Sequence, residues 1–355
     1  MKILALNSFE KSTVAALYEN FDLLWIENQE YGEAELSEFP DVMSQEGFRV
    51  DKLRELLESR GIKPNLIQAF VATGGLLHSV TGGTYQITME MLQDLQSCKY
   101  GESPANLGAL LAIRMAALAG TRSAFIVDPP VVDEMPPSAH ITGLPEIGRR
   151  SGFHALNQRA VAQREAANMG KPIKECNFIV CHLDDEISIG AHKNGVVVEV
   201  NDIRAGTGPM SARRAGSLPP VPLVDLCFSG KYTQDELKSL LMEGGGFKAH
   251  LDTDDIGEVV RRVRSGDRKA ILTLEAFMFQ IIKAVGGCAA ILEGHVDAII
   301  LTGGMVKNEY VIGRLTESIN WISRVVAYPA EHETLSLVEG VIRVMRGAEE
   351  AKNYA

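Results

Sequence analysis

The sequence has little of what marks disulfide-rich or nucleic-acid-binding proteins. Its five cysteines are dispersed, odd in number and contain no CxxC pair, which indicates free thiols in a reducing compartment. One of them, Cys181, ends an apolar segment and is interpreted as a small core residue. Basic residues are outnumbered, and the formal net charge is −11 at pH 7. This balance disfavours binding to nucleic acid, which needs a basic surface that displaces counterions.

Long uninterrupted apolar runs are also missing. The N-terminal MKILALNS is too short for the apolar part of a signal peptide. The most apolar later region, 282–305, is broken by Glu293, His295 and Asp297, so it does not form a continuous span of about 20 residues. These absences predict a cytoplasmic protein without a membrane segment. The 355 residues are 46% hydrophobic and 23% charged, which is typical of a soluble globular chain with room for two domains.

A pattern of strand, turn, strand and strand occurs twice along the chain. The first copy occupies 2–6, 13–18 and 23–28, and the second occupies 177–181, 187–192 and 196–200. In the second copy Asn194 and Gly195 suit a tight hairpin turn, because both residue types tolerate positive φ. Two such copies, about 175 residues apart, predict an internal duplication in which each copy opens one domain.

Helical patterns and further strands follow each copy. The alternation predicts an α/β protein whose sheets are covered by helices, and the longest apolar helix is expected to be buried. No low-complexity linker is present, so we expect two domains held close, with a cleft between them. The expected helices are 50–61, 106–120, 153–170, 233–246, 267–294 and 334–353, and the later strands are 296–304 and 323–329.

Two glycines follow the buried strand within LTGGMVKNEY (301–310). Without side chains, Gly303 and Gly304 would let a base or ribose lie against the backbone. A simple helix-entry turn explains the pattern as well. Arg214 could grip phosphate or carboxylate with two parallel hydrogen bonds, although a lone surface arginine is commoner. His154 at a helix start and His182 at a strand end are equally compatible with structural roles.

The turn in CHLDDEISIG contains three consecutive acids, Asp184, Asp185 and Glu186. Glycines are common where a turn approaches a phosphate, whereas these carboxylates would repel it. Like unit charges 4 Å apart repel by about 4 kcal/mol at an effective dielectric of about 20. Alternatively, acids in such a turn could hold Mg²⁺, which would bridge to phosphate.

Taken in order, several segments resemble the butyrate kinase branch of the acetate kinase family. The matching motifs are GGTY (82–85), NLGALLA (106–112), AFIVDPPVVDE (124–134), TGLPEIGRRSGFHALNQ (142–158), LVDLCFSGKYT (223–233), DAIILTGG (297–304) and AYPAEHETLSLVEG (327–340). The resemblance implies the ribonuclease H-like fold of actin, Hsp70 and sugar kinases, with two duplicated βββαβα domains around a nucleotide cleft. It assigns 1–155 plus the C-terminal helix 335–355 to an acyl-substrate domain and 156–334 to a nucleotide-binding domain.

The resemblance also implies a reaction, its ligands and its site residues. The family moves the γ-phosphoryl of ATP to a short-chain carboxylate, with Mg²⁺, and forms homo-oligomers built from dimers. Carried over by position, the catalytic residues are Asn7, His154, His182, Arg214 and Glu333, and Glu333 is also the candidate metal ligand. The cofactor-binding positions are Ser12, Thr13, Asp184, Asp185, Glu186, Gly303 and Gly304, and the substrate-pocket positions are Thr73, Gly74, Gly75 and Asp128.

The sequence departs from the family pattern at charged and glycine positions of the site. Phe9 stands for a glycine, Val14 for a lysine, Thr73 for an arginine and Ala205 for an aspartate, and the acids 184–186 stand for three glycines. Lys11 could supply a cation from a different turn position. The first hypothesis is that phosphoryl transfer is lost or strongly weakened, while nucleotide binding or a partner role in acyl metabolism persists. The alternative is an active kinase for a short-chain, branched or aromatic carboxylate with a rearranged phosphate site.

Overall fold

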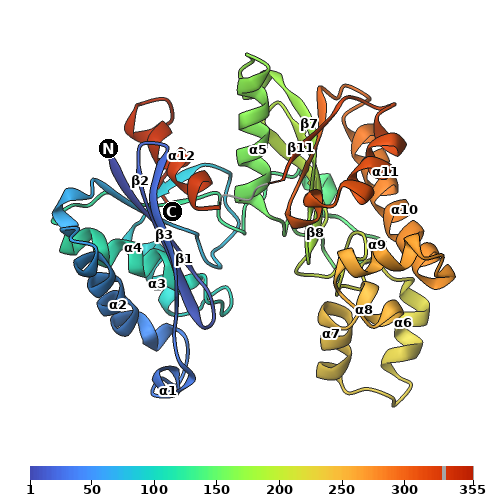
Figure 1. Ribbon diagram of the computed structural model, residues 1–355, viewed down its shortest axis with the longest axis horizontal. Coiled ribbons are helices and arrows are strands. Elements are labelled where there is room, and N and C mark those ends of the chain that lie inside the picture. Colours follow the sequence, from blue (N-terminus) through green and yellow to red (C-terminus); the bar gives the residue numbers. More distant parts are fainter. Residues whose placement is uncertain (330–332, 355) are drawn as a thin grey trace. The chain divides into compact units, whose positions relative to one another are not determined.

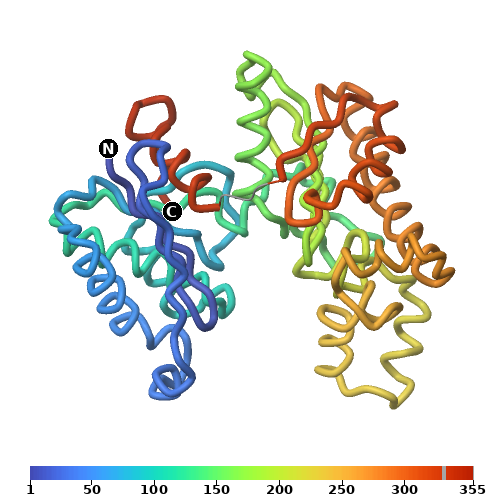
Figure 2. Tube along the Cα trace, in the orientation of Figure 1, coloured from blue at the N-terminus to red at the C-terminus, as the bar shows by residue number. Residues whose placement is uncertain are grey.

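The computed structural model describes residues 1–329 and 333–354, so residues 330–332 of the motif 327–340 and residue 355 lie outside the described part. The chain divides into two compact units (Figure 1), Met1–Asp133 with His332–Ala355, and Glu134–Glu331. They are called unit 1 and unit 2 below. The trace in Figure 2 shows that the N-terminal strand and the C-terminal helix both belong to unit 1. The boundary predicted after residue 155 lies inside unit 2 of this division.

Unit 1 is built on a mixed sheet with the strand order β3-β2-β1-β4-β6-β5. Strands β1, β4 and β6 are parallel, while β2 runs antiparallel to β1 and β3, and β5 antiparallel to β6. The β1–β2 register ends at Ser8 opposite Thr13, so the hairpin turn lies between them. The strands are β1 (Lys2–Ser8), β2 (Ser12–Glu19), β3 (Asp22–Glu30), β4 (Ala69–Ala72), β5 (Thr84–Gln86) and β6 (Ala124–Val127).

Helices cover the sheet of unit 1, and its inner strands are buried on both faces. The six residues of β1 after Lys2 are all buried, as are all four residues of β4. Helices α4 and α12 both contact β1, β4 and β6, and α2 packs beside α4. The helices are α1 (Glu33–Leu36), α2 (Glu46–Ser59), α3 (Met89–Gln96), α4 (Asn106–Leu118) and α12 (Glu333–Met345).

The C-terminal helix is shorter than the sequence predicted. It was expected to reach residue 353, but α12 ends at Met345, and Gly347 follows with φ +71°. A left-handed glycine at this place terminates a helix. Beyond it the chain runs along the sheet, where the Lys352 N–H donates to a carbonyl of β5 at 2.8 Å. The Tyr354 hydroxyl then donates to Asp94 at 2.8 Å, so the last residues are fastened to unit 1.

Unit 2 repeats the strand arrangement of unit 1. Its sheet has the order β11-β10-β7-β8-β9, with β7, β10 and β11 parallel and β8 and β9 forming an antiparallel meander with β7. This order and these directions match β6-β4-β1-β2-β3, which confirms the predicted α/β class and the duplication. The strands are β7 (Asn177–Leu183), β8 (Ile187–Lys193), β9 (Val196–Val200), β10 (Ala298–Thr302) and β11 (Val325–Tyr328).

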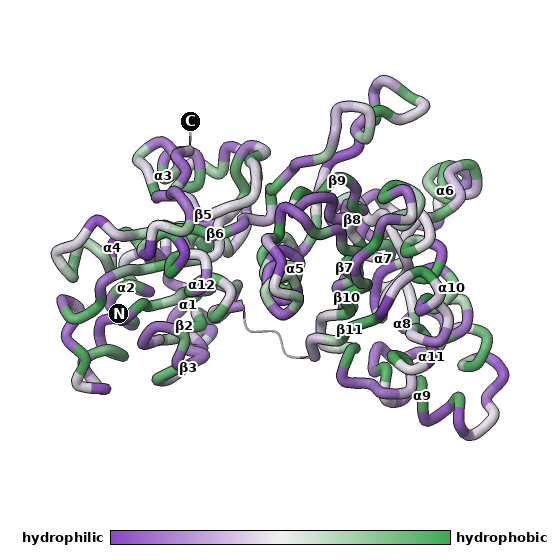
Figure 3. Tube along the Cα trace, turned by 90° about the horizontal axis from the view of Figure 1, so that it is seen from above, coloured by the Kyte–Doolittle hydropathy of each residue, from purple (hydrophilic) through white to green (hydrophobic). Residues whose placement is uncertain are grey.

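Successive residues of β7 enter two different core layers. Phe178 packs in a layer with Val161 of α5, whereas Cys181 packs in a layer with Phe277 of α10. Helices therefore cover both faces, and β7 and β10 are largely hydrophobic in Figure 3. Cys181 is fully buried, which confirms the interpretation as a core residue. The helices are α5 (Ala155–Asn168), α6 (Pro220–Cys227), α7 (Gln234–Glu243), α8 (Gly246–Leu251), α9 (Ile256–Arg264), α10 (Arg268–Ile291) and α11 (Glu309–Ile319).

Helix α10, expected to be buried, lies in the core on one side only. Phe277 and Ile281 are fully buried, whereas Leu272 is 68% and Phe279 is 66% exposed. Among the described residues it is the one helix long and apolar enough, by length and composition, to cross a membrane. Its buried side belongs to the core of unit 2.

Candidate functional site

The predicted site residues fall into two groups, one in each unit. Unit 1 contains Asn7, Ser12, Thr13, Thr73, Gly74, Gly75, Asp128 and Glu333. Unit 2 contains His154, His182, Asp184, Asp185, Glu186, Arg214, Gly303 and Gly304.

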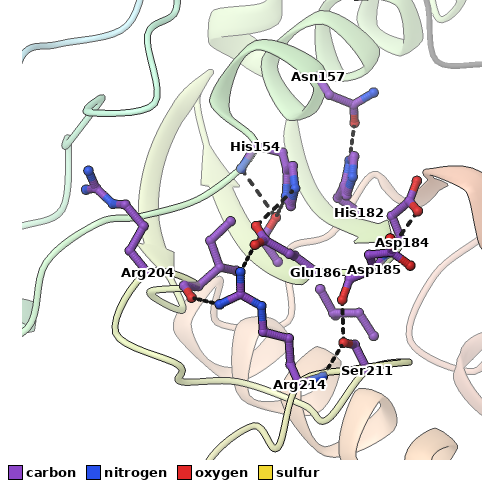
Figure 4. A network of polar contacts seen from close by, with 12 residues as sticks. His154, Asn157, His182, Asp184, Asp185, Glu186, Arg204, Ser211 and Arg214 are labelled. Atoms are coloured by element: carbon purple, nitrogen blue, oxygen red, sulfur yellow. Dashed lines mark hydrogen bonds and ion pairs between the residues drawn. The ribbon is translucent and has the colours of Figure 1, made fainter. Parts of the chain in front are cut away.

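In unit 2 the acidic turn between β7 and β8 reaches Arg214 (Figure 4). The Glu186 carboxylate is in direct contact with the Arg214 guanidinium as an ion pair. Their side chains are 33% and 19% exposed, so the pair is partly buried. Arg214 also donates to the carbonyl oxygen of Ile203 at 3.0 Å. A cavity of about 10 Å³ adjoins the pair, which is room for about one water molecule. The guanidinium is therefore already occupied by an anion that belongs to the chain.

The other two acids of the turn have different surroundings. Asp184 accepts the Gly304 N–H at 2.8 Å and the Asp185 N–H at 2.9 Å. Its carboxylate thus joins the β7–β8 turn to the start of the short 3₁₀ helix η5 (Gly304–Lys307). The Asp185 side chain is exposed, and its backbone carbonyl accepts the Ser211 hydroxyl. The Glu186 carboxylate therefore faces an arginine, that of Asp184 faces two backbone N–H groups, and that of Asp185 faces solvent.

The two predicted histidines lie against each other. The rings of His154 and His182 are stacked with centroids 3.6 Å apart and an interplanar angle of 10°. The ring nitrogen Nδ1 of His182 lies 3.0 Å from Asn157 Oδ1, an acceptor, so Nδ1 bears the proton and Nε2 can accept. Nδ1 of His154 lies 2.9 Å from the Ser188 hydroxyl. The arrangement brings two predicted catalytic residues together through partners that the sequence did not indicate.

Both histidines are neutral at pH 7. Burial lowers the pKa of His154 to about 4, with Asp184 opposing this shift and Arg214 adding to it. Burial and the neighbouring His154 hold the pKa of His182 well below its ordinary value. Neither ring therefore brings a positive charge to a phosphate at neutral pH. Arg214 carries the positive charge that lowers the pKa of His154, and Glu186 is already paired with it.

The glycine turn after β10 is required by the packing of unit 2 itself. Gly303 has φ +95°, and a Cβ added to it would lie 2.4 Å from the carbonyl oxygen of Leu183. A Cβ on Gly304 would lie 2.9 Å from a carboxylate oxygen of Asp184. The close approach of β7 therefore explains the first glycine without a ligand. The role of this turn in holding a nucleotide stays a prediction.

In unit 1 three predicted residues from distant parts of the sequence meet near the end of β1. The Thr73 hydroxyl donates to Asn7 Oδ1 at 3.0 Å, and Asn7 Nδ2 donates to Glu333 Oε2 at 2.5 Å. The hydroxyl of Thr73 is neutral, so this residue supplies no positive charge to a carboxylate. The three side chains form a connected polar group with a single anionic member, Glu333.

The substrate-pocket glycines of unit 1 are in tight packing. A Cβ on Gly74 would lie 2.6 Å from Pro129 Cβ, and one on Gly75 would lie 2.5 Å from Asn106 Cα. Asp128 is 4% exposed and accepts the Gly83 N–H at 2.7 Å. Packing accounts for both glycines, and a substrate contact at these positions stays a prediction.

One functional candidate of unit 1 was missed from the sequence, namely Arg49. It is fully buried beneath the β1–β2 turn and donates to several of its oxygens, including Thr13 Oγ1 at 3.3 Å. Thr13 is itself fully buried, which places its hydroxyl below the turn. Lys11 on the turn forms an exposed pair with Glu33 at 3.0 Å, which contributes little. The helix was predicted to start at residue 50, so Arg49 lay outside it; the one available signal was its spacing of four from Gln45.

The described residues do not form a complete cage for a metal ion. Among them no group of three or more His, Cys, Asp or Glu side chains is placed to hold one. Mg²⁺ is commonly held by one or two carboxylates together with substrate phosphates. The side chains of this protein fit Mg²⁺ only when substrate phosphates supply the remaining ligands. The predicted protein ligand is the Glu333 carboxylate, which accepts a hydrogen bond from Asn7.

Two solved structures that superpose over nearly the whole chain are an acetate kinase and a propionate kinase. The acetate kinase of Porphyromonas gingivalis superposes with a TM-score of 0.78 at 19% identity, covering 97% of this chain and 99% of that one. A propionate kinase from Francisella tularensis gives a TM-score of 0.72 at 17% identity, over 96% and 98% of the two chains. At these identities they show the fold, which is the acetate kinase type of two-unit α/β protein.

Sequence relatives narrow the class to a family. The family model described as "Acetokinase family" matches residues 9–322. A protein of Listeria monocytogenes named "Probable butyrate kinase" is 42% identical over 352 residues, which is 99% of each chain. "Butyrate kinase 2" of Clostridium acetobutylicum is 40% identical over 353 residues, again 99% of each. The chain belongs to the acetokinase family.

Proposed function

We propose that this protein is a member of the butyrate kinase branch in which Glu186 restrains phosphoryl transfer by occupying Arg214. The observation behind the proposal is the ion pair between these two residues. Phosphoryl transfer depends on positive charge placed around the moving phosphate. The resemblance assigns that role to Arg214, and a carboxylate already bound to it competes with an incoming phosphate.

The partial burial of the pair sets the size of the effect. An exposed pair contributes up to about 1 kcal/mol, and separating a fully buried one costs about 3–5 kcal/mol. With side chains 33% and 19% exposed, Glu186 and Arg214 lie between these limits. Releasing Arg214 should cost about 1–3 kcal/mol, which corresponds to about 5- to 150-fold in affinity or rate.

Unit 1 adds a second reason for slow transfer. Thr73 bonds to Asn7 with a neutral hydroxyl, where the resemblance places an arginine for the substrate carboxylate. In unit 2, Ala205 offers no carboxylate where the resemblance places one beside the metal and phosphate. We therefore expect weak use of butyrate or another short-chain carboxylate. The proposal also includes binding of ATP or ADP, with Mg²⁺, through the turn at Gly303. It further includes assembly from dimers and a partner role in acyl metabolism.

An active carboxylate kinase is the second candidate. It is favoured by the bonding of the acidic turn, because Asp184 is held by the Gly304 N–H and Glu186 by Arg214. Of the three carboxylates, the one that faces solvent is that of Asp185. A rotation of Glu186 away from the guanidinium would leave Arg214 free for phosphate. The three carboxylates of the turn could then point away from that phosphate.

Acyl phosphate formation distinguishes the two candidates. Purified protein is assayed with ATP, Mg²⁺ and carboxylates of two to six carbons, with hydroxylamine trapping the product. We expect turnover below about 1 per second, since active kinases turn over at about 1–100 per second. Turnover within that range would exclude the restrained form. Calorimetry with adenosine and with ATP shows whether the phosphates contribute to binding at all.

A pair of variants isolates the restraint. Glu186→Gln removes the negative charge that pairs with Arg214, and we expect ATP affinity or kcat/KM to rise about 5- to 150-fold. Asp185→Asn is the matched control, because it removes one charge from the same turn without touching Arg214. We expect it to change these values by less than about threefold, as for exposed charges. Equal effects of the two variants would mean that general repulsion, not the ion pair, limits the reaction.

A further inference from the structure

The β1–β2 turn rests on a buried arginine. Arg49 extends from the first turn of α2 and is fully buried. Its guanidinium donates to the backbone carbonyls of Phe9 at 2.8 Å, Glu10 at 2.8 Å and Ser12 at 2.9 Å. Arginine has five N–H donors in a fixed plane, so one side chain can fix several carbonyls at once. These three carbonyls therefore point inward, toward α2.

The remaining partners of Arg49 are neutral. Its guanidinium donates to the Ser8 hydroxyl at 3.0 Å and to Gln45 Oε1 at 2.7 Å, and it lies 4.9 Å from the centre of the Tyr31 ring. Among the ion pairs found in residues 1–329 and 333–354, none involves Arg49. A guanidinium stays protonated when buried. The positive charge under the turn is thus hydrogen-bonded to neutral groups and lies near an aromatic ring, while the Glu10 carboxylate attracts it without forming an ion pair.

The inward carbonyls determine where the N–H groups of the turn point. In a planar trans peptide the C=O and the N–H point in opposite directions. The Phe9 carbonyl faces Arg49, so the Glu10 N–H faces away from it, and the Glu10 carbonyl likewise turns the Lys11 N–H outward. Within the described part of the chain these two N–H groups have no hydrogen-bond acceptor. Successive outward N–H groups in a turn form a concave site for an anion.

We propose that Arg49 is the positioning residue of this turn, holding the Glu10 and Lys11 N–H groups outward to receive a phosphate group. Its buried charge adds attraction from behind the same peptides. The turn can then receive phosphate although Phe9 and Val14 stand where the resemblance places a glycine and a lysine. The inference rests on the proposed function in one respect, which is that a protein of this family still binds phosphorylated ligands.

A purely structural role for Arg49 makes a different prediction. If Arg49 only ties α2 to the hairpin, its replacement lowers stability but leaves anion binding by the folded protein unchanged. Inorganic pyrophosphate is a suitable probe, because it has no adenosine or acyl part and needs no turnover. The full chain is titrated with it while the ¹⁵N–¹H signals of the Glu10 and Lys11 amides and of Arg49 Nε are followed. We expect all three signals to shift saturably.

Two substitutions separate the charge of Arg49 from its geometry. Arg49→Met should weaken pyrophosphate binding at least tenfold, and Arg49→Lys, which keeps the charge but not the planar fork, should be intermediate. Arg54→Met is the matched control, because Arg54 lies on the same helix, is 49% exposed and pairs with Asp51. We expect it to bind as the unmodified protein does.

Three results would overturn the inference. They are no saturable shift of the Glu10 and Lys11 amides, equal affinity in folded Arg49→Met, or an Arg54→Met effect as large as that of Arg49→Met. If Arg49→Met does not fold, the Arg49 Nε signal and Arg49→Lys decide in its place. The test is separate from that of the proposed function, because the Glu186 variants are judged on ATP affinity or kcat/KM. The pyrophosphate shifts of the Glu10 and Lys11 amides can appear whether or not the protein forms acyl phosphate.

Discussion

Acidification should destabilise unit 2 through His154, well above the pH at which carboxylates are protonated. The pKa of this residue is lowered from 6.5 to about 4 by burial, with Arg214 contributing in the same direction. The unfolded chain therefore binds more protons than the folded one between about pH 4 and 6.5. It follows that stability rises with pH in this window, is complete above it, and is lost as the pH falls.

The size of the loss follows from the two pKa values. At pH 5 a histidine with a pKa of 6.5 in the unfolded chain and about 4 in the fold costs about 2 kcal/mol, and below pH 4 the full cost is about 3 kcal/mol. His182 and His192 act in the same direction, because burial also lowers their pKa values. The groups that face His154 are His182, Asp184, Glu186 and Arg214.

The loss of stability is measured by urea unfolding of unit 2 at pH 7 and pH 5. The pKa of His154 is measured by an NMR titration of its ring signal. We expect a ring midpoint near 4 and a loss of at least about 2 kcal/mol between the two pH values. His154→Gln should reduce that loss by about 2 kcal/mol and leave the part due to the other histidines. A ring midpoint near 6.5, or an unchanged loss in His154→Gln, would refute the reasoning.

Three further predictions test other contacts of the two units. Arg214→Gln should raise the pKa of His154, because Arg214 lowers it, and a ring titration by NMR measures the change. Gly303→Ala should destabilise unit 2 by roughly 2–4 kcal/mol in urea unfolding, because φ is +95° and the new Cβ would lie 2.4 Å from a carbonyl oxygen of β7. Tyr354→Phe should destabilise unit 1 by roughly 1–3 kcal/mol in the same measurement, because it removes the buried bond to Asp94 at 2.8 Å. An unchanged titration midpoint of His154 would contradict the first prediction. An unfolding curve that matches the unmodified protein would contradict the second or the third.

The duplicated fold was accessible from the sequence because its signals are local. The strands of each copy are continuous apolar or alternating runs, and the turn at Asn194 and Gly195 is specified by two adjacent residues with positive φ. The end of α12 was predicted wrongly for the opposite reason. The segment after Gly347 favours a helix by composition, but its backbone bonds go to β5, which is far away in sequence.

The candidate site was only partly accessible. Positions such as His154 and His182 could be placed on elements, but their stacking depends on how α5 packs on β7. The acidic turn was expected to repel phosphate as a block of three charges. Its members instead have separate partners, and the bond from Arg214 to Glu186 joins residues 28 positions apart. Arg49 gave only one weak signal, its spacing of four from Gln45, and a charged residue at a helix start is usually exposed.

The way in which unit 1 is assembled has a consequence for synthesis of the chain. Strand β1 is among the first segments made, whereas α12, which packs on β1, β4 and β6, is among the last. Roughly 200 residues of unit 2 are made in between, which takes about 10–40 s at about 5–20 residues per second. During that interval unit 2 can complete its core while one face of the unit 1 sheet remains uncovered. A chain that stalls or is cut before α12 would thus present an apolar sheet to its surroundings and depend on chaperones.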